Sequence, residues 1–176
     1  TRMDYNFDHV YSEGMLNYSP TDESGNFTMG LRDIKLAKGW YLQGQYTTLA
    51  DRNPWFHISG MWGTINSSET IETVVTHVKD KFMFNMGNMH TTTNFDSGLV
   101  TNVTPIDSVW GEISWRNEGL RLAVGSMPYV VKGDIDVRLP STIDSQGVVH
   151  YDTFNFEIEN QFATYSSVNY TNSFRN

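Results

Sequence analysis

The chain of 176 residues contains no cysteine, few basic residues and no long apolar run. Without cysteine, disulfide scaffolds, thiolate metal sites and cysteine nucleophiles are excluded. Twelve Lys and Arg residues against twenty Asp and Glu residues give a formal net charge of −8, which argues against a nucleic-acid partner. No apolar run exceeds three residues, whereas a membrane-spanning helix needs about 20 mostly apolar residues. The sequence therefore predicts no transmembrane helix.

What the sequence does contain is apolar and polar residues in alternation. The clearest example is 134–139, where Ile135, Val137 and Leu139 alternate with charged residues. Successive side chains of a strand point to opposite faces of the sheet, so this pattern predicts strands with one apolar and one polar face. We expect about eight to ten strands and no helix. The other alternating segments are 40–47, 56–63, 120–125, 154–159 and 162–170.

Two turn sequences predict β-hairpins. Residues 116–119, Arg-Asn-Glu-Gly, separate the apolar segments 109–115 and 120–124. Residues 144–147, Asp-Ser-Gln-Gly, follow a strand that we expect Pro140 to end. Asn, Asp, Ser and Gly favour tight turns, and such turns join neighbouring antiparallel strands. The sequence therefore predicts an antiparallel all-β fold over residues 1–176, without an internal repeat or a linker.

Alternation fits two architectures. In a soluble β-sandwich the apolar faces pack together inside the protein. In an antiparallel up-and-down β-barrel of the outer-membrane type, the apolar faces contact lipid and the polar faces line the lumen. The mean hydropathy of −0.42 allows a barrel, because its strands need only every second residue to be apolar. Aromatic residues near the predicted strand ends favour the barrel, since they suit interfacial girdles: Trp40, Tyr41, Trp55, Trp110, Trp115 and Tyr129.

The barrel interpretation assigns each side of the alternating strands to an environment. The polar positions that we predict to face the lumen are Asp134, Asp136, Arg138, Asn155, Glu157 and Glu159. The apolar positions that we predict to face lipid include Ile135, Val137, Leu139, Phe154, Phe156, Ile158, Leu120, Leu122 and Val124.

No sequence motif for catalysis or cofactor binding is present. The five histidines show no metal-ligand spacing, and the chain has neither a GxSxG motif nor a phosphate-binding glycine motif. The pairs Asp134/Asp136 and Glu157/Glu159 each place two carboxylates on one strand face, which would also suit a glycosidase or a calcium ion. Such pairs are equally typical of a solvated strand face. We therefore expect no cofactor, no metal and no catalytic residue in this chain.

Four segments carry a resemblance to a known family. They are NPWFHISGMWGTINSSE (53–69), MHTTTNFDSGLVTNVTPIDS (89–108), VWGEISWRNEGLRLAVG (109–125) and GDIDVRLPSTIDSQGVVHY (133–151). Together they resemble the C-terminal region of subtilisin-like (S8) serine proteases of Gram-negative bacteria, of the autotransporter type. The catalytic Asp, His and Ser motifs of that family match nothing in this chain, so no catalytic residue is carried over.

The resemblance implies a function for the chain within a longer polypeptide. In this family the downstream domain is a translocator β-barrel in the outer membrane, and the protease domain lies upstream. The implied partners are the lipid bilayer, the outer-membrane assembly machinery and the upstream passenger protease. The alternatives are a secreted, soluble β-sandwich that binds a glycan or a protein, and a small jelly-roll hydrolase.

Overall fold

The computed structural model describes residues 3–9, 12–20 and 27–170, and it describes side chains from residue 28 onward. Within these ranges the chain forms thirteen strands, one 3-10 helix and no α-helix. No helix in these ranges is both long enough and apolar enough to span a membrane. The elements are β1 (Met3–His9), β2 (Ser12–Pro20), β3 (Phe27–Ala37), β4 (Trp40–Ala50), η1 (Gly60–Trp62), β5 (Gly63–Lys79), β6 (Phe82–Ser97), β7 (Val100–Val103), β8 (Ile106–Asn117), β9 (Leu120–Ser126), β10 (Tyr129–Lys132), β11 (Asp134–Ile143), β12 (Val149–Glu157) and β13 (Thr164–Tyr170).

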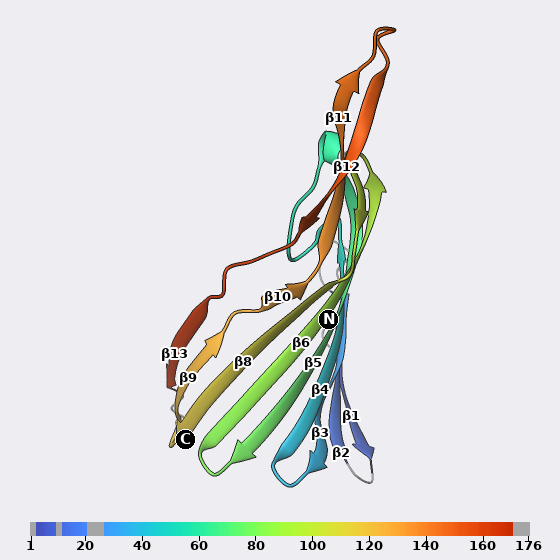
Figure 1. Cartoon of the computed structure of the whole chain (residues 1–176). Coiled ribbons are helices and arrows are strands. Elements are labelled where there is room, and N and C mark those ends of the chain that lie inside the picture. The colour runs from blue at the N-terminus through green and yellow to red at the C-terminus, as the bar shows by residue number, and fades with distance from the viewer. Residues whose placement is uncertain (1–2, 10–11, 21–26, 171–176) are drawn as a thin grey trace.

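The strands form one large and one small antiparallel sheet (Figure 1). The large sheet has the order β1-β2-β3-β4-β5-β6-β8-β9-β13, and β10 also pairs with β8. The small sheet has the order β12-β11-β7 and projects from one end of the large sheet. The predicted antiparallel all-β architecture is confirmed. The described strands do not close into a barrel, because β1 and β13 are the two outer strands of the large sheet and do not pair.

The two ends of the large sheet differ in their connections (Figure 1). At one end, two-residue turns at 38–39, 80–81 and 118–119 join β3 to β4, β5 to β6 and β8 to β9. Residues Gly39, Asp80, Glu118 and Gly119 adopt positive φ angles in these turns. At the other end, the connection from β4 to β5 and the one from β9 to β13 are long, and the second includes β10, β11 and β12. The large sheet therefore has a turn end and a loop end.

Both predicted hairpins are confirmed, whereas three details of the prediction are wrong. The described residues alone form thirteen strands rather than eight to ten. Pro140 lies inside β11 and does not end it, because a register shift between Pro140 and Thr142 accommodates the missing N–H. The segment 56–63, predicted as a strand, is a loop followed by η1 and the first residue of β5. Side chains fix this loop: Asn53 donates to Thr93 Oγ1 at 2.6 Å, and the indole of Trp55 donates to Thr91 Oγ1 at 3.1 Å.

The apolar side of the small sheet forms a core of its own. Val100, Val103 and Val137 are buried there. Their partly buried neighbours are Phe56, Ile58, Phe95, Leu99, Ile135 and Leu139. The prediction that Val137 faces lipid is therefore wrong, because side chains of the 51–62 loop cover this side of β11 and leave Val137 only 8% exposed.

The carboxylate of Asp144 organises the turn of the β11–β12 hairpin. Asp144 Oδ1 accepts the backbone N–H of Gln146 at 2.8 Å and that of Val148 at 2.9 Å. Hydrogen bonding from these amides, that of Val148 above all, lowers the pKa of Asp144, because the ionised carboxylate is the better acceptor. His150 Nε2 lies 3.5 Å from Asp144 Oδ2. The ionised carboxylate therefore stabilises this turn.

We predict that Asp144→Ala exposes the amides of Gln146 and Val148 to hydrogen exchange. Since the pKa of Asp144 is lowered in the folded chain, its contribution is complete above the usual aspartate pKa and is lost as the pH falls through the lowered value. Amide protection factors measured by NMR check both effects. Asp152→Ala, on β12 of the same hairpin, is the control and leaves these two amides protected. Unchanged protection in Asp144→Ala would contradict this role.

Candidate functional site

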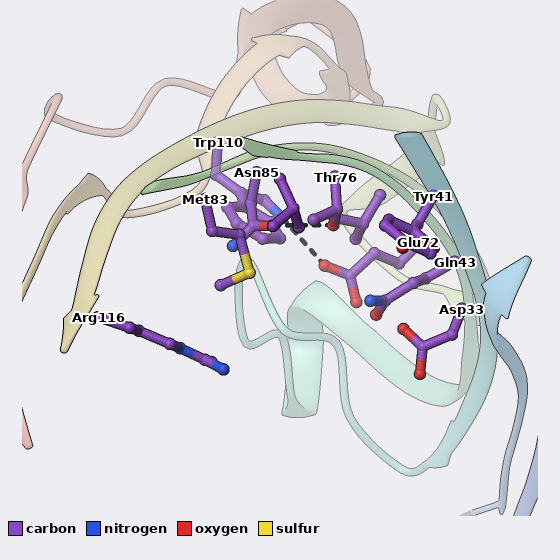
Figure 2. Close-up of a pocket in the computed structure, with 11 residues that line it drawn as sticks. Asp33, Tyr41, Gln43, Glu72, Thr76, Met83, Asn85, Trp110 and Arg116 are labelled. Atoms are coloured by element: carbon purple, nitrogen blue, oxygen red, sulfur yellow. Dashed lines mark hydrogen bonds between the residues drawn. The ribbon is translucent and has the colours of Figure 1, made fainter. Parts of the chain in front are cut away.

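Side chains on the two faces of the large sheet differ in chemistry. The sheet curves, and Figure 2 shows polar side chains gathered on its concave side. The register of the strands brings apolar side chains together on the opposite, convex face. The convex apolar band comprises Trp40, Leu42 and Tyr46 of β4, Ile71 and Val75 of β5, Phe82, Phe84 and Met86 of β6, Val109, Ile113 and Trp115 of β8, Leu120, Leu122 and Val124 of β9, and Val168 and Tyr170 of β13.

No charged residue interrupts this band on the six strands that form it. The convex face carries Lys79 next to the β5–β6 turn, and Glu69 and Asp107 toward the loop end. Between these levels, the convex positions of β4, β5, β6, β8, β9 and β13 carry His77 and otherwise only apolar, aromatic, glycine or uncharged polar residues. An apolar surface that runs across six strands without a charge is far larger than the isolated apolar residues of an ordinary protein surface.

The convex apolar band is not covered by any other part of the described chain. Ile113 is 54% exposed, Val124 is 61% exposed and Met86 is 72% exposed. These exposed fractions are those of surface positions, although isoleucine, valine and methionine have apolar side chains. The band is therefore an apolar surface that the described residues leave exposed.

Aromatic side chains mark the turn end of the convex apolar band. Trp40 follows the β3–β4 turn, and its ring centroid lies 4.3 Å from that of His77. Phe82 follows the β5–β6 turn and is in register with Trp115 on β8. Tyr170 is in register with Leu120, which follows the β8–β9 turn. The short turns thus align one row of aromatic residues across the sheet.

The concave face carries a hydrogen-bonded network centred on Glu112. This carboxylate accepts hydrogen bonds from Asn85 Nδ2 at 3.2 Å, from Tyr165 OH at 2.8 Å, and from the guanidinium of Arg121. Thr76 in turn donates to Asn85 Oδ1 at 2.8 Å. The five residues come from β5, β6, β8, β9 and β13, so the network crosses the sheet perpendicular to its strands. The side chain of Glu112 is 9% exposed, and its charge is balanced by that of Arg121.

Two glycines make room for large aromatic side chains on the concave face. A Cβ atom at Gly87 would lie 2.2 Å from the indole of Trp110, so Trp110 rests directly on the backbone of β6. Its Nε1 donates to Glu72 Oε1 at 3.0 Å. A Cβ atom at Gly125 would lie 2.9 Å from the phenol of Tyr165, which reaches over β9 to Glu112. Glycine here permits close approach of side chain and backbone.

The structure distributes the predicted interfacial aromatics over several locations. Trp40 and Trp115 lie on the convex face. Tyr41 and Trp110 line the concave hollow shown in Figure 2. Trp55 lies in the 51–62 loop, and Tyr129 of β10 contacts Phe162 with ring centroids 6.0 Å apart.

Five of the six residues predicted to face the lumen lie in the small sheet. Asp134, Asp136 and Arg138 of β11 are in register with Glu157, Asn155 and Thr153 of β12, and Glu159 follows β12. Asp136 accepts hydrogen bonds from the amides of Asn155 at 2.8 Å and Asn102 at 3.0 Å, and these bonds lower its pKa. The described residues contain no cluster of three or more His, Asp or Glu side chains that could hold a metal ion.

Sequence reasoning missed the network on the concave face. Glu112, Arg121 and Tyr165 are distant in sequence and meet only because β13 pairs with β9 beyond the long 127–163 connection. The sequence contains one indication of this network. Apolar and polar residues alternate in 109–115 and 120–124, and this alternation places Glu112 and Arg121 on the polar side of one hairpin.

Comparisons with known proteins identify no relative: no protein-family model, no curated protein and no solved structure matches the chain.

We predict that Gly87→Ala destabilises the folded chain by about 1–3 kcal/mol, because the added methyl group displaces Trp110 from β6. Gly44→Ala is the matched control, since Gly44 also lies inside a strand and a Cβ atom there meets nothing within 4 Å. Its effect is expected to be neutral or slightly stabilising. Denaturant unfolding followed by tryptophan fluorescence measures both. Equal stabilities of the two variants would show that Trp110 does not need Gly87.

Proposed function

We propose that the chain forms part of an outer-membrane β-barrel, with its convex face against lipid and its concave face toward a hydrated interior. The observation that carries this proposal is the convex apolar band, which crosses six strands without a charged residue. By the resemblance of its sequence, the barrel is the translocator of an autotransporter. It anchors an upstream subtilisin-like protease at the outer membrane and exports it.

The lengths of four of the six strands in the band, β4, β5, β6 and β8, support this proposal, whereas β9 and β13 have seven residues each. A membrane-spanning β-strand needs about 9–11 residues when it is tilted. Strand β4 has 11 residues and β8 has 12 residues. Pairing of neighbouring strands satisfies the backbone amides and carbonyls, which lipid would leave without partners at a cost of several kcal/mol each.

The difference between the two ends of the sheet also supports it. Outer-membrane barrels have short turns on the periplasmic side and longer loops on the outer side. The large sheet has two-residue turns at one end and long connections at the other. The aromatic row formed by Trp40, Phe82, Trp115 and Tyr170 lies at the turn end, where a girdle at the periplasmic interface belongs. The small sheet then projects to the outside of the cell.

The polarity of the concave face argues against the soluble sandwich. In a sandwich the apolar faces of two sheets pack on each other. Here the small sheet packs its apolar side against the 51–62 loop and against Phe95 and Leu99, and no described strand covers the convex apolar band. The concave face holds the Glu112–Arg121 ion pair, as the hydrated interior of a barrel would.

We predict that Met86→Arg lowers the free energy of unfolding in lipid vesicles by about 2–4 kcal/mol, the cost of arginine near the middle of a bilayer, because Met86 lies midway between the aromatic row and the level of Asp107. Ile143→Arg is the matched control, because Ile143 is 70% exposed and Met86 is 72% exposed, yet Ile143 lies in the projecting hairpin. In water, both substitutions at exposed sites would change stability by only about 0.5 kcal/mol.

Denaturant titration of the vesicle-bound protein measures both variants, and flotation on a density gradient tests whether the unmodified chain partitions with lipid. Equal effects of the two substitutions, or a folded chain that stays in the aqueous fraction, would refute the membrane assignment.

A further inference from the structure

The concave face contains a hollow of about 550 Å³, a volume typical of sites that bind small molecules. Asp33 of β3 and Arg116 of β8 reach into it from opposite sides, as Figure 2 shows. Tyr41 and Gln43 of β4 and Met83 of β6 form part of its wall. The hollow thus has an acidic side and a basic side, with an aromatic ring, an amide and a thioether between them.

Most polar groups deep in the hollow already have partners within the protein. Glu72 accepts the indole N–H of Trp110, and Asn85 bridges Thr76 and Glu112. In contrast, the carboxylate of Asp33 and the guanidinium of Arg116 make no hydrogen bond or ion pair to the described part of the chain. The groups available to a ligand therefore include the carboxylate of Asp33 and the guanidinium of Arg116 on opposite sides, with the carboxylate of Glu72, which is bonded only to a neutral indole, on the acidic side between them (Figure 2).

The absence of a carboxylate partner for Arg116 follows from the register of β8 and β9. Arg116 is directly opposite Arg121, and two like charges in such a pair repel each other. Arg121 is neutralised by Glu112, whereas Arg116 points into the hollow without a counter-charge. A carboxylate brought by a ligand would neutralise it through the two parallel N–H donors of the guanidinium.

We infer that the hollow binds a zwitterionic solute of the size of a dipeptide. The ammonium group of the solute contacts Asp33, beside the hydroxyl of Tyr41 and the amide of Gln43. The carboxylate of the solute contacts Arg116, and apolar parts of the solute lie against Met83. This inference goes beyond the proposed membrane function and requires only that the hollow is open to water.

The first experiment uses the unmodified protein and modified ligands. Alanylalanine is titrated into the folded chain by isothermal calorimetry, next to its N-acetylated form and its C-terminally amidated form. We expect saturable one-to-one binding of alanylalanine, and each blocked form binds about tenfold more weakly or worse, because it has lost one charged contact. The inference would be overturned if alanylalanine showed no saturable binding, or if all three compounds bound equally well.

The second experiment assigns each charge to its side chain. Asp33→Asn is chosen because Asp33 has a φ of 58°, and asparagine tolerates that conformation. It should weaken alanylalanine about tenfold and leave the N-acetylated form unchanged. Arg116→Gln should weaken alanylalanine and leave the amidated form unchanged. Arg138→Gln, at an exposed site of β11 outside the hollow, is the control and retains full binding.

Thermal unfolding of each variant verifies that it is folded. If both variants fold and bind alanylalanine as the unmodified chain does, the assignment of the site is wrong. That result leaves the membrane proposal standing, because neither Asp33 nor Arg116 is part of the convex apolar band.

Discussion

One constraint governs the six strands of the convex apolar band: between their ends the charged side chains lie on the concave side and none lies on the convex side. Burial in water-soluble proteins works the other way, because the hydrophobic effect gathers apolar groups inside. Here strand after strand repeats the inverted arrangement, from Leu42 on β4 to Val168 on β13. No described residue covers the convex side, and the concave side combines hydrogen bonds and the Glu112–Arg121 ion pair with buried apolar side chains such as Ile106 and Ala123.

The concave face also buries hydroxyl side chains, some of which form hydrogen bonds across neighbouring strands, whereas Ser108 Oγ and Ser114 Oγ are buried without a partner. Residues with small hydroxyl side chains occupy much of the concave face, and Thr70 and Thr91 form a buried hydrogen bond of 3.0 Å across β5 and β6. Large side chains fit only where glycine gives room, as with Trp110 over Gly87. The inside of a curved sheet has less space than the outside, so glycine, serine and threonine on this face are a consequence of the curvature. Their pattern supports a sheet that is polar on the inside.

The sequence was sufficient to predict the strands where alternation and turn chemistry agree. The β8–β9 hairpin is the best example, because 118–119 supply the turn and the residues on either side alternate. The same alternation failed for 56–63, since side-chain hydrogen bonds from Asn53 and Trp55 hold this segment as a loop. Alternation of apolar and polar residues indicates that a strand has two different faces, but it does not indicate which face other residues cover. For that reason alternation predicts a lipid contact for Val137, although side chains of the 51–62 loop bury it.

The candidate site was harder to predict because its parts come from strands far apart in sequence. Glu112 and Tyr165 meet only after β10, β11 and β12 have left the large sheet and β13 has returned to its edge. Asp33 reaches the hollow because β3 is irregular at this point: its register with β4 shifts between Leu31 and Ile34. No periodicity in the sequence encodes such a shift, because a one-residue slip reverses the faces of all the following side chains.

The directions of the strands set a condition on closure of the proposed barrel. Each neighbour in the nine-strand path of the large sheet is antiparallel, so its first and last strands, β1 and β13, run in the same direction. Direct pairing of these edges would be parallel, and so would pairing of β13 with β1 of a second copy inserted in the same orientation. Outer-membrane barrels are antiparallel throughout. An odd number of additional strands between β1 and β13 satisfies both the antiparallel pattern and the need to pair every edge group in lipid.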